Sequence, residues 1–309
     1  MPQLSFKSNR FRLILANLAL LSGLLSLQAT AQNEQKPAAA PLPTGAPLFK
    51  IADPAINELS GFAASRAYPG LLWGNNDSGD TARLFLINQE GKTVATVNFE
   101  GIDARDWEDI AAAGDSLYVG DMGDNLSVME NIKIHRIREP KLDPQKLGQN
   151  ITIASNNIET ATVTYPDGPH DAESLSVAPD GSILIVSKST SGSNFYISQN
   201  VFRRGAIPLK KIGETFHFGG EGIFTKLATS GDLSPDGKKL LVGTYSQLYE
   251  FPLTRAYDFN SVDSKNAKTQ DLPTLKQSES ACYDLDGKQI FVSSEKPNPP
   301  VYALNSLLN

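Results

Sequence analysis

Two short loops are dense in oxygen-bearing side chains. They read Asn75-Asn76-Asp77-Ser78-Gly79-Asp80 and Gly120-Asp121-Met122-Gly123-Asp124-Asn125. Such oxygens bind hard cations or hydrogen-bond a polar ligand. The alternative is an Asx-turn network that only shapes the loops, because turns favour Asp, Asn and Gly for conformational reasons. The candidate ligand-binding residues are Asn76, Asp77, Asp80, Asp121, Asp124 and Asn125.

An acidic residue also recurs in front of five short apolar runs, at intervals of 50, 65, 59 and 47 residues. If these runs are equivalent strands around one axis, their carboxylates converge, and converging carboxylates cannot all stay ionised and dry. A cation, water or basic side chains must compensate them, and oxygen ligands without His or Cys favour Ca²⁺. The alternative is that the acids cap the strands by accepting hydrogen bonds from backbone amides of the neighbouring unit. The candidate metal ligands are Glu58, Glu108, Glu173, Asp232 and Glu279.

Support for catalysis is sparse. Arg105, Lys188 and His170 could receive an anionic group, and His170 beside Asp171 is the best general base among the three histidines. For each of them, a surface or inter-blade ion pair is the ordinary alternative. The chain has no GxSxG, P-loop or strand-associated GxGxxG motif. The candidate catalytic residues are therefore His170, Asp171, Arg105 and Lys188, without covalent serine or cysteine chemistry.

The elements that must position these residues form a repeat. Each acidic anchor is followed by an apolar run, a turn, a second run, a polar loop and a third run. Several of the turns carry Asp-Gly, which between apolar runs is a strong hairpin signal. Fourth strands are clearest at Thr93–Phe99 and Thr160–Tyr165. Four-stranded units at this spacing predict an all-β fold, a single β-propeller of five blades.

The two ends of the repeat bear on how the ring closes. The fifth unit lacks a fourth strand of its own, and the strand-like segment Leu48–Ile51 stands alone before the first unit. We expect Leu48–Ile51 to pair with Val301–Leu304, so that the N-terminal strand closes the propeller without an open sheet edge. Six blades is the alternative, because Glu221-Gly222-Ile223 could open an extra unit.

The segment before the repeat resembles a targeting sequence. Residues 1–31 combine three basic residues, the 15-residue apolar run Leu13–Leu27 and an Ala29-Thr30-Ala31 cleavage site. This pattern predicts a secretory signal peptide, and a membrane anchor would need about 18 apolar residues. Residues 32–47 are rich in Pro and Ala and predict an extended linker before a propeller domain over 48–309. We therefore expect an exported protein, periplasmic or extracellular and without a membrane segment after cleavage.

Composition excludes several classes of protein. The 309 residues include one cysteine, which rules out a disulfide scaffold and Cys-cluster metal sites. The net charge is −6, and removal of the signal peptide makes it −9, which argues against nucleic-acid binding. We expect a monomer whose partner is a small-molecule or protein ligand.

These motifs resemble a family of exported bacterial β-propeller proteins. The shared residues are the Asn-Asp-Ser-Gly-Asp loop, Asp-Trp-Glu-Asp-Ile-Ala, Gly-Asp-Met-Gly-Asp-Asn, and the His-Asp-Ala-Glu-Ser and Ser-Pro-Asp-Gly turns, spread over most of Glu58–Glu295. The resemblance implies a propeller architecture and brings no particular activity.

A more distant resemblance, in layout, is to calcium-activated nucleotidases (apyrases), which are five-bladed with a central Ca²⁺. It implies that Glu58, Glu108 and Glu279 lie near calcium, with Asp77 and Asp80 in the neighbouring loop. The chain departs from that family in this loop, and we place no counterparts of the basic residues with which the family holds phosphates.

Two functions follow as expectations. The first is an exported ligand-binding or scaffolding propeller with a cation, Ca²⁺, at its central channel and no catalysis required. The second is a Ca²⁺-dependent hydrolase of phosphate esters, phosphoanhydrides or lactones, which must gather a cation, a positioned water, a base and positive charge in one pocket.

Overall fold

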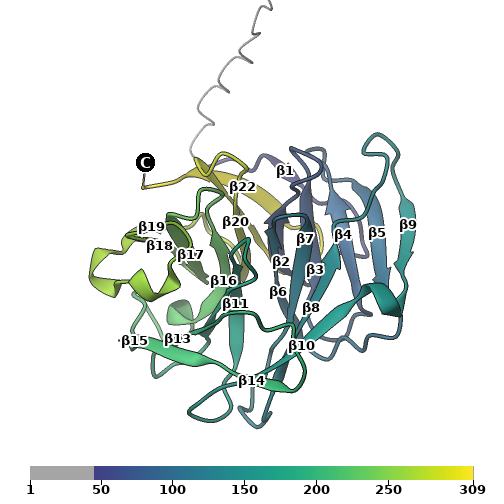
Figure 1. Cartoon of the computed structure of the whole chain (residues 1–309). Helices are drawn as coiled ribbons and strands as arrows, with labels where there is room; N and C mark the ends of the chain where they lie inside the picture. The colour runs from purple at the N-terminus through teal and green to yellow at the C-terminus, as the bar shows by residue number, and fades with distance from the viewer. Residues whose placement is uncertain (1–44, 309) are drawn as a thin grey trace, which may run out of the picture. The chain divides into compact units, whose positions relative to one another are not determined.

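Five sheets, antiparallel apart from one added parallel strand in each of two, form the fold that the computed structural model describes for residues 45–308 (Figure 1). The first strand of each blade is the innermost one, and these strands contact one another in cyclic order, with the last contacting the first. They are β2 (Leu59–Ala64), β6 (Trp107–Ala113), β11 (Ala172–Val177), β16 (Ala228–Leu233) and β20 (Ser278–Tyr283). The protein is a five-bladed β-propeller, and Glu221–Ile223 lies in the connection between two blades and opens no sixth one.

The outer strands follow in chain order within each blade, except that the N-terminal β1 is outermost in the last blade. The second strands are β3 (Leu72–Asn76), β7 (Ser116–Asp121), β12 (Ile183–Ser187), β17 (Lys239–Thr244) and β21 (Gln289–Ser294). The third strands are β4 (Arg83–Ile87), β8 (Ile132–Arg138), β13 (Ser193–Ser198), β18 (Gln247–Pro252) and β22 (Pro300–Asn305). The fourth strands are β5 (Thr93–Phe99), β10 (Glu159–Thr164), β15 (Lys210–Phe216), β19 (Lys268–Asp271) and, in the last blade, β1 (Phe49–Lys50).

The N-terminal strand β1 pairs antiparallel with β22, with Phe49 opposite Val301 and Lys50 opposite Pro300. The Leu48 amide donates to the Val301 carbonyl at 2.7 Å, and the Ile51 amide donates to the Pro299 carbonyl at 3.0 Å. The expected pairing of the two chain ends is therefore present, shifted toward the start of β22.

Two blades carry a fifth strand that the sequence did not lead us to expect. Strand β9 (Gln149–Ile153) belongs to the connection within the second blade but pairs parallel with β5 of the first. Strand β14 (Ala206–Pro208) belongs to the third blade and pairs parallel with β10 of the second. Each of these connections reaches back to the preceding blade and ties the two sheets together.

The hydrophobic core is divided among the blade interfaces. Five clusters of buried residues each combine side chains of two neighbouring blades, and one of them joins the last blade to the first through Cys282, Val301 and Phe62. The helices of residues 45–308 are four three-residue 3-10 turns, η1 (Ser155–Asn157), η2 (Phe224–Lys226), η3 (Phe259–Ser261) and η4 (Ser264–Asn266). Within that range, then, no helix has the length and apolar character needed to span a bilayer.

The predicted signal peptide over 1–31 and almost all of the predicted linker over 32–47 lie outside the described residues. The structure therefore leaves both of these predictions as they were.

Candidate functional site

A β-bulge near the start of every first strand sets the geometry of the channel mouth. In each blade the pairing of the first and second strands skips one residue, and bulges of this kind commonly re-aim a side chain. The skipped residues are Ser60, Glu108, Glu173, Thr229 and Glu279. Three of the five predicted acids thus occupy equivalent positions in their blades.

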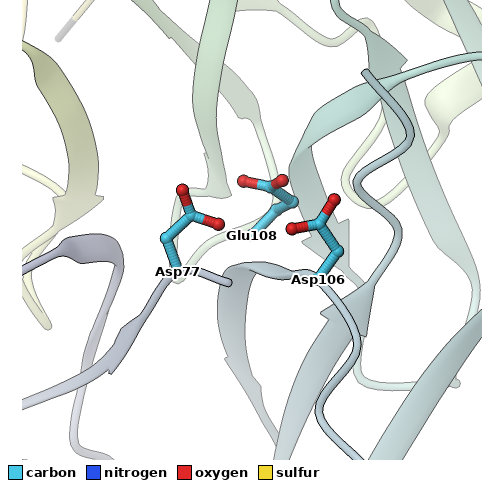
Figure 2. A group of neighbouring side chains, drawn as sticks. All are labelled: Asp77, Asp106 and Glu108. Carbon is cyan, nitrogen blue, oxygen red and sulfur yellow. The ribbon is translucent and has the colours of Figure 1, made fainter. Parts of the chain in front are cut away.

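Three carboxylates from the first two blades meet at this mouth. Asp77 directly follows β3, Asp106 directly precedes β6, and Glu108 is the bulged residue of β6. Each offers an oxygen that lies within 4.8 Å of the others, and Figure 2 shows the three groups turned toward one another. Two oxygens bound to the same Ca²⁺ are separated by at most about twice the 2.3–2.6 Å metal–ligand distance. The spacing is therefore compatible with a single ion.

These carboxyl groups are poorly solvated and close to like charges. Burial, assisted by the charge of Asp77, raises the pKa of Asp106 to about 6. Burial raises the pKa of Glu108 well above its ordinary value, and the charge of Glu173 adds to the effect. The pKa of Asp77 is also raised, again mainly by burial. A cation would relieve this repulsion, because an opposite charge at short range favours the ionised carboxylates.

The second predicted loop, residues 120–125, holds the backbone of Asp106 in place through hydrogen bonds. Asp121 is buried, and its carboxylate accepts the backbone amide of Asp106 at 3.0 Å. The amides of Met122 and Gly123 donate to the Asp106 carbonyl at 3.1 and 3.3 Å. Arg105 donates to the carbonyls of Asp121 and Gly123, at 3.3 and 3.1 Å. Arg105 and Asp121 thus act on the conformation of the segment that carries Asp106.

Gly123 lets this loop approach the carboxylates closely. A Cβ atom at this position would overlap Glu108 Oε1 and Asp106 Oδ2. Any side chain larger than hydrogen would therefore displace two of the three groups, and the glycine is needed here for space.

A second network continues around the mouth from the third blade to the fifth. Lys188, just after β12, forms an ion pair with Glu173, and its Nζ lies 5.5 Å from the ring centroid of Tyr245. Tyr245 Oη donates to Glu279 Oε1 at 2.9 Å. Glu173 and Glu279 are each 5% exposed, and the Oε2 atom of each is buried without a hydrogen-bond partner. Burial, followed by the charge of Glu295, raises the pKa of Glu279 to about 7.

The other two predicted metal ligands do not share this position. Glu58 precedes β2 and lines a cavity of about 360 Å³ together with Asn76 and Asp80. Asp232 lies three residues beyond the bulge of β16, where its carboxylate accepts the amides of Tyr283 at 2.8 Å and Leu233 at 2.7 Å. The expectation that all five acids are equivalent was wrong for Glu58 and Asp232, because the bulged position in their blades is held by Ser60 and Thr229 instead. Asp232 has the strand-capping role that was the alternative.

Asp109 is a channel carboxylate that sequence reasoning missed. It is fully buried, and its Oδ2 accepts the amides of Leu175 at 2.9 Å and Gly231 at 3.0 Å, from the third and fourth blades. Its Oδ1 accepts the Ile110 amide at 2.9 Å. Burial raises its pKa well above the ordinary value against the opposing effect of these amides. Asp109 thereby ties three blades together.

The remaining loop residues shape the backbone. Asn76 Nδ2 donates to the Ala55 carbonyl and to Asp80 Oδ2, both at 2.8 Å, and Asp80 forms an ion pair with Arg83, also at 2.8 Å. Asp124 Oδ2 accepts the Met129 amide at 2.7 Å within its own loop. Asn125 is exposed. These contacts match the turn-network alternative, whereas Asp77 alone among the predicted loop residues joins the carboxylate trio.

The predicted pairing of His170 with Asp171 is absent. His170 Nε2 lies 3.0 Å from Asp167 Oδ1, while Asp171 accepts the backbone amide of Asp124 at 2.8 Å. His170 and Asp171 are therefore held by different partners.

Asp106 is the second site residue that we did not name as a ligand. It is two residues before Glu108, within the Asp-Trp-Glu-Asp-Ile-Ala motif. That spacing was the available signal.

Comparisons with known proteins add a likeness of shape. No protein-family model matches the chain, and no curated protein matches it either. A PQQ-bound aldose sugar dehydrogenase from Streptomyces coelicolor aligns with a TM-score of 0.45 and 12% identity, over 86% of this chain and 99% of that one. A putative gluconolactonase aligns with a TM-score of 0.42 and 14% identity, over 80% of this chain and 76% of that one. Hydrazine synthase from Kuenenia stuttgartiensis aligns with a TM-score of 0.43 and 10% identity, over 89% of this chain and 99% of that one. At this level of similarity, nothing about activity passes to this chain.

Proposed function

We propose that this protein is an exported β-propeller that binds a polar ligand through a divalent cation at the mouth of its channel. Asp77, Asp106 and Glu108 would hold the cation. The observation that carries the proposal is the convergence of their oxygens to within 4.8 Å of one another. Binding or scaffolding requires no catalysis.

A second observation supports a cation rather than an acidic patch without a ligand. The buried Oε2 atoms of Glu173 and Glu279 have no hydrogen-bond partner, although buried polar groups in folded proteins are normally satisfied. Glu173 also acts directly on Glu108, since its charge raises the pKa of that group. Positive charge in the mouth would compensate carboxylates of both networks.

The donor set favours Ca²⁺ and leaves room for a ligand. The trio offers only carboxylate oxygens, which suit hard cations, and Ca²⁺ accepts six to eight oxygen ligands. Three carboxylates leave coordination positions for water or for oxygens of the bound molecule. The ligand therefore belongs to the class of molecules with several oxygen donors.

The test is calcium binding by the purified chain. We expect the unfolding temperature to be higher in Ca²⁺ than in EDTA. The free energy of unfolding should rise by about 2.7 kcal/mol when free Ca²⁺ is a hundredfold above Kd. Glu108→Gln keeps the shape but replaces one anionic ligand, and should abolish most of this gain. Asp115→Asn is the matched control, because it removes one charge from an exposed turn at the other end of β6. Identical melting curves in Ca²⁺ and EDTA would contradict the proposal.

A Ca²⁺-dependent hydrolase of phosphate esters, phosphoanhydrides or lactones is the second candidate. It is favoured by the Lys188 ammonium, which belongs to the same mouth and partly offsets the burial that raises the pKa of Asp77 and Glu108. Such a positive charge could stabilise negative charge that develops on a substrate. A panel of these substrates, assayed with Ca²⁺ and with EDTA, distinguishes the two functions. Turnover that requires Ca²⁺ and is lost in Glu108→Gln would favour the hydrolase.

Export is proposed from the first 31 residues. We expect the protein in the periplasm or medium of a bacterial host, with a mature chain that begins at Gln32. N-terminal sequencing of the fractionated protein tests this.

We also propose that β1 closes the ring. Its pairing with β22 and the full burial of Ile51 support this role. Removal of residues through Ile51 should therefore lower the unfolding temperature strongly, whereas removal through Pro47 should change it little.

A further inference from the structure

Lys188 is an unusual occupant of an acidic channel mouth. Its side chain is only 12% exposed, and that of its partner Glu173 is 6% exposed. From this ion pair a continuous set of contacts runs across the ring of Tyr245 to Glu279, through three neighbouring blades. The ammonium thus pairs with one buried carboxylate, and Tyr245 links it to a second.

We infer that the Lys188 ammonium fills a second cation position in this mouth, at Glu173 and beside the Tyr245–Glu279 pair. In this arrangement the lysine is a tethered cation, and the trio of Asp77, Asp106 and Glu108 is the one position left open to a metal ion. The inference rests on the proposed function, because it assigns how many ions the same mouth accepts.

The unpartnered oxygens support this assignment. An ammonium group can donate three hydrogen bonds, whereas a Ca²⁺ ion binds six to eight oxygen atoms. Lys188 reaches Glu173 Oε1, and Glu173 Oε2 and Glu279 Oε2 both remain without a partner. With the ammonium removed, Glu173 would keep two buried carboxylate oxygens without a partner, in addition to the unpartnered Oε2 of Glu279. Carboxylate oxygens are ligands that Ca²⁺ takes in proteins.

The lysine's charge acts on both of these glutamates, because it partly offsets the burial that raises the pKa of Glu173 and Glu279. Lys296 provides a natural contrast. It pairs with Glu295 at 2.6 Å, but its side chain is 44% exposed, so it lies at the solvent-facing rim.

The experiment counts bound Ca²⁺ by equilibrium dialysis of the purified mature protein. We expect one ion per chain for the wild type, two for Lys188→Met, and one for Lys296→Met, which removes the same charge from the rim. The double variant Lys188→Met/Glu108→Gln should return to one ion, because it retains only the second position. One ion in both the wild type and Lys188→Met would overturn the inference and leave the proposed function intact. No ion in the wild type would overturn the proposed function itself.

A folding control keeps the test decisive. Lys188→Met leaves Glu173 without its partner, so we expect it to be unstable in EDTA and to recover in Ca²⁺. Lys188→Met/Glu173→Gln removes both charges and should fold in EDTA, yet bind only one ion. If Lys188→Met stays unfolded at high Ca²⁺ while this double variant folds, the lysine is a structural ion-pair partner and the inference is wrong.

Discussion

Two groups of buried carboxylates lie in the channel of this propeller, and they differ in the hydrogen-bond partners of their oxygens. Asp109 and Asp232 lie beyond the bulges and have backbone amides as partners on both oxygens. Glu173 and Glu279 lie at the bulges, and each retains a buried oxygen without a partner. Both kinds are buried, so burial alone does not identify a binding residue. The difference lies in whether the fold itself supplies the hydrogen bonds.

This contrast separates structural acids from acids that are available to a ligand. An amide-bonded carboxylate is compensated by the fold, and its removal should reduce stability in any buffer. A carboxylate that keeps one buried oxygen without a partner carries a desolvation cost, which an added positive charge relieves. Three predictions test this division, from the largest expected effect to the smallest.

Asp109→Asn should destabilise the propeller by about 3 kcal/mol. The amide keeps the shape of the side chain but offers one acceptor oxygen in place of two, so buried amides of neighbouring blades lose their partner, at about 1–3 kcal/mol each. Urea unfolding monitored by tryptophan fluorescence measures this loss. The loss should be the same in Ca²⁺ and in EDTA. A variant of normal stability with an altered Ca²⁺ response would place Asp109 in the binding group instead.

Asp232 should make stability fall as pH rises from about 4 to 6. Burial raises its folded-state pKa to about 6 from the ordinary 3.8. Within this window the folded state keeps the proton that the unfolded state has released, so unfolding becomes easier as pH rises. Two pKa units correspond to at most about 3 kcal/mol. In EDTA, the free energy of unfolding of the wild type should therefore fall with rising pH relative to that of Asp232→Asn. The difference between the two proteins should become constant above pH 6. Parallel pH curves for the two proteins would show that the pKa of Asp232 is not raised in the folded state.

Asp80→Asn should have the smallest effect. Asp80 pairs with the partly exposed Arg83 and with Asn76, and ion pairs of this kind contribute about 1 kcal/mol or less. The Ca²⁺-induced rise in unfolding temperature should persist in this variant. Asp77→Asn, three residues earlier in the same loop, should lose that rise with little change in EDTA. If Ca²⁺ raised the unfolding temperature of the two variants equally, Asp77 would not differ from Asp80 in its role.

The amino-acid sequence by itself determined the all-β class, the five blades and the position of most strands. Apolar runs and turn residues act over a few neighbouring positions, so Thr93–Phe99 is a strand in the structure as the pattern indicates. The same local pattern located Glu108, Glu173 and Glu279 at the starts of equivalent strands, and Asp77 in a loop beside them.

Only the tertiary structure decided which acids meet. One skipped residue in a strand pair changes which side a side chain faces, and no local pattern marks where the skip falls. Asp232 lies three residues beyond its bulge and accepts backbone amides there, whereas the loop around Gly123 holds the backbone of Asp106 beside Glu108. The parallel strands β9 and β14 depend on pairing with another blade, and Asp109 depends on amides more than 60 residues away in sequence, at Leu175 and Gly231. These contacts are decided by how the blades pack, because their partners come from distant parts of the chain.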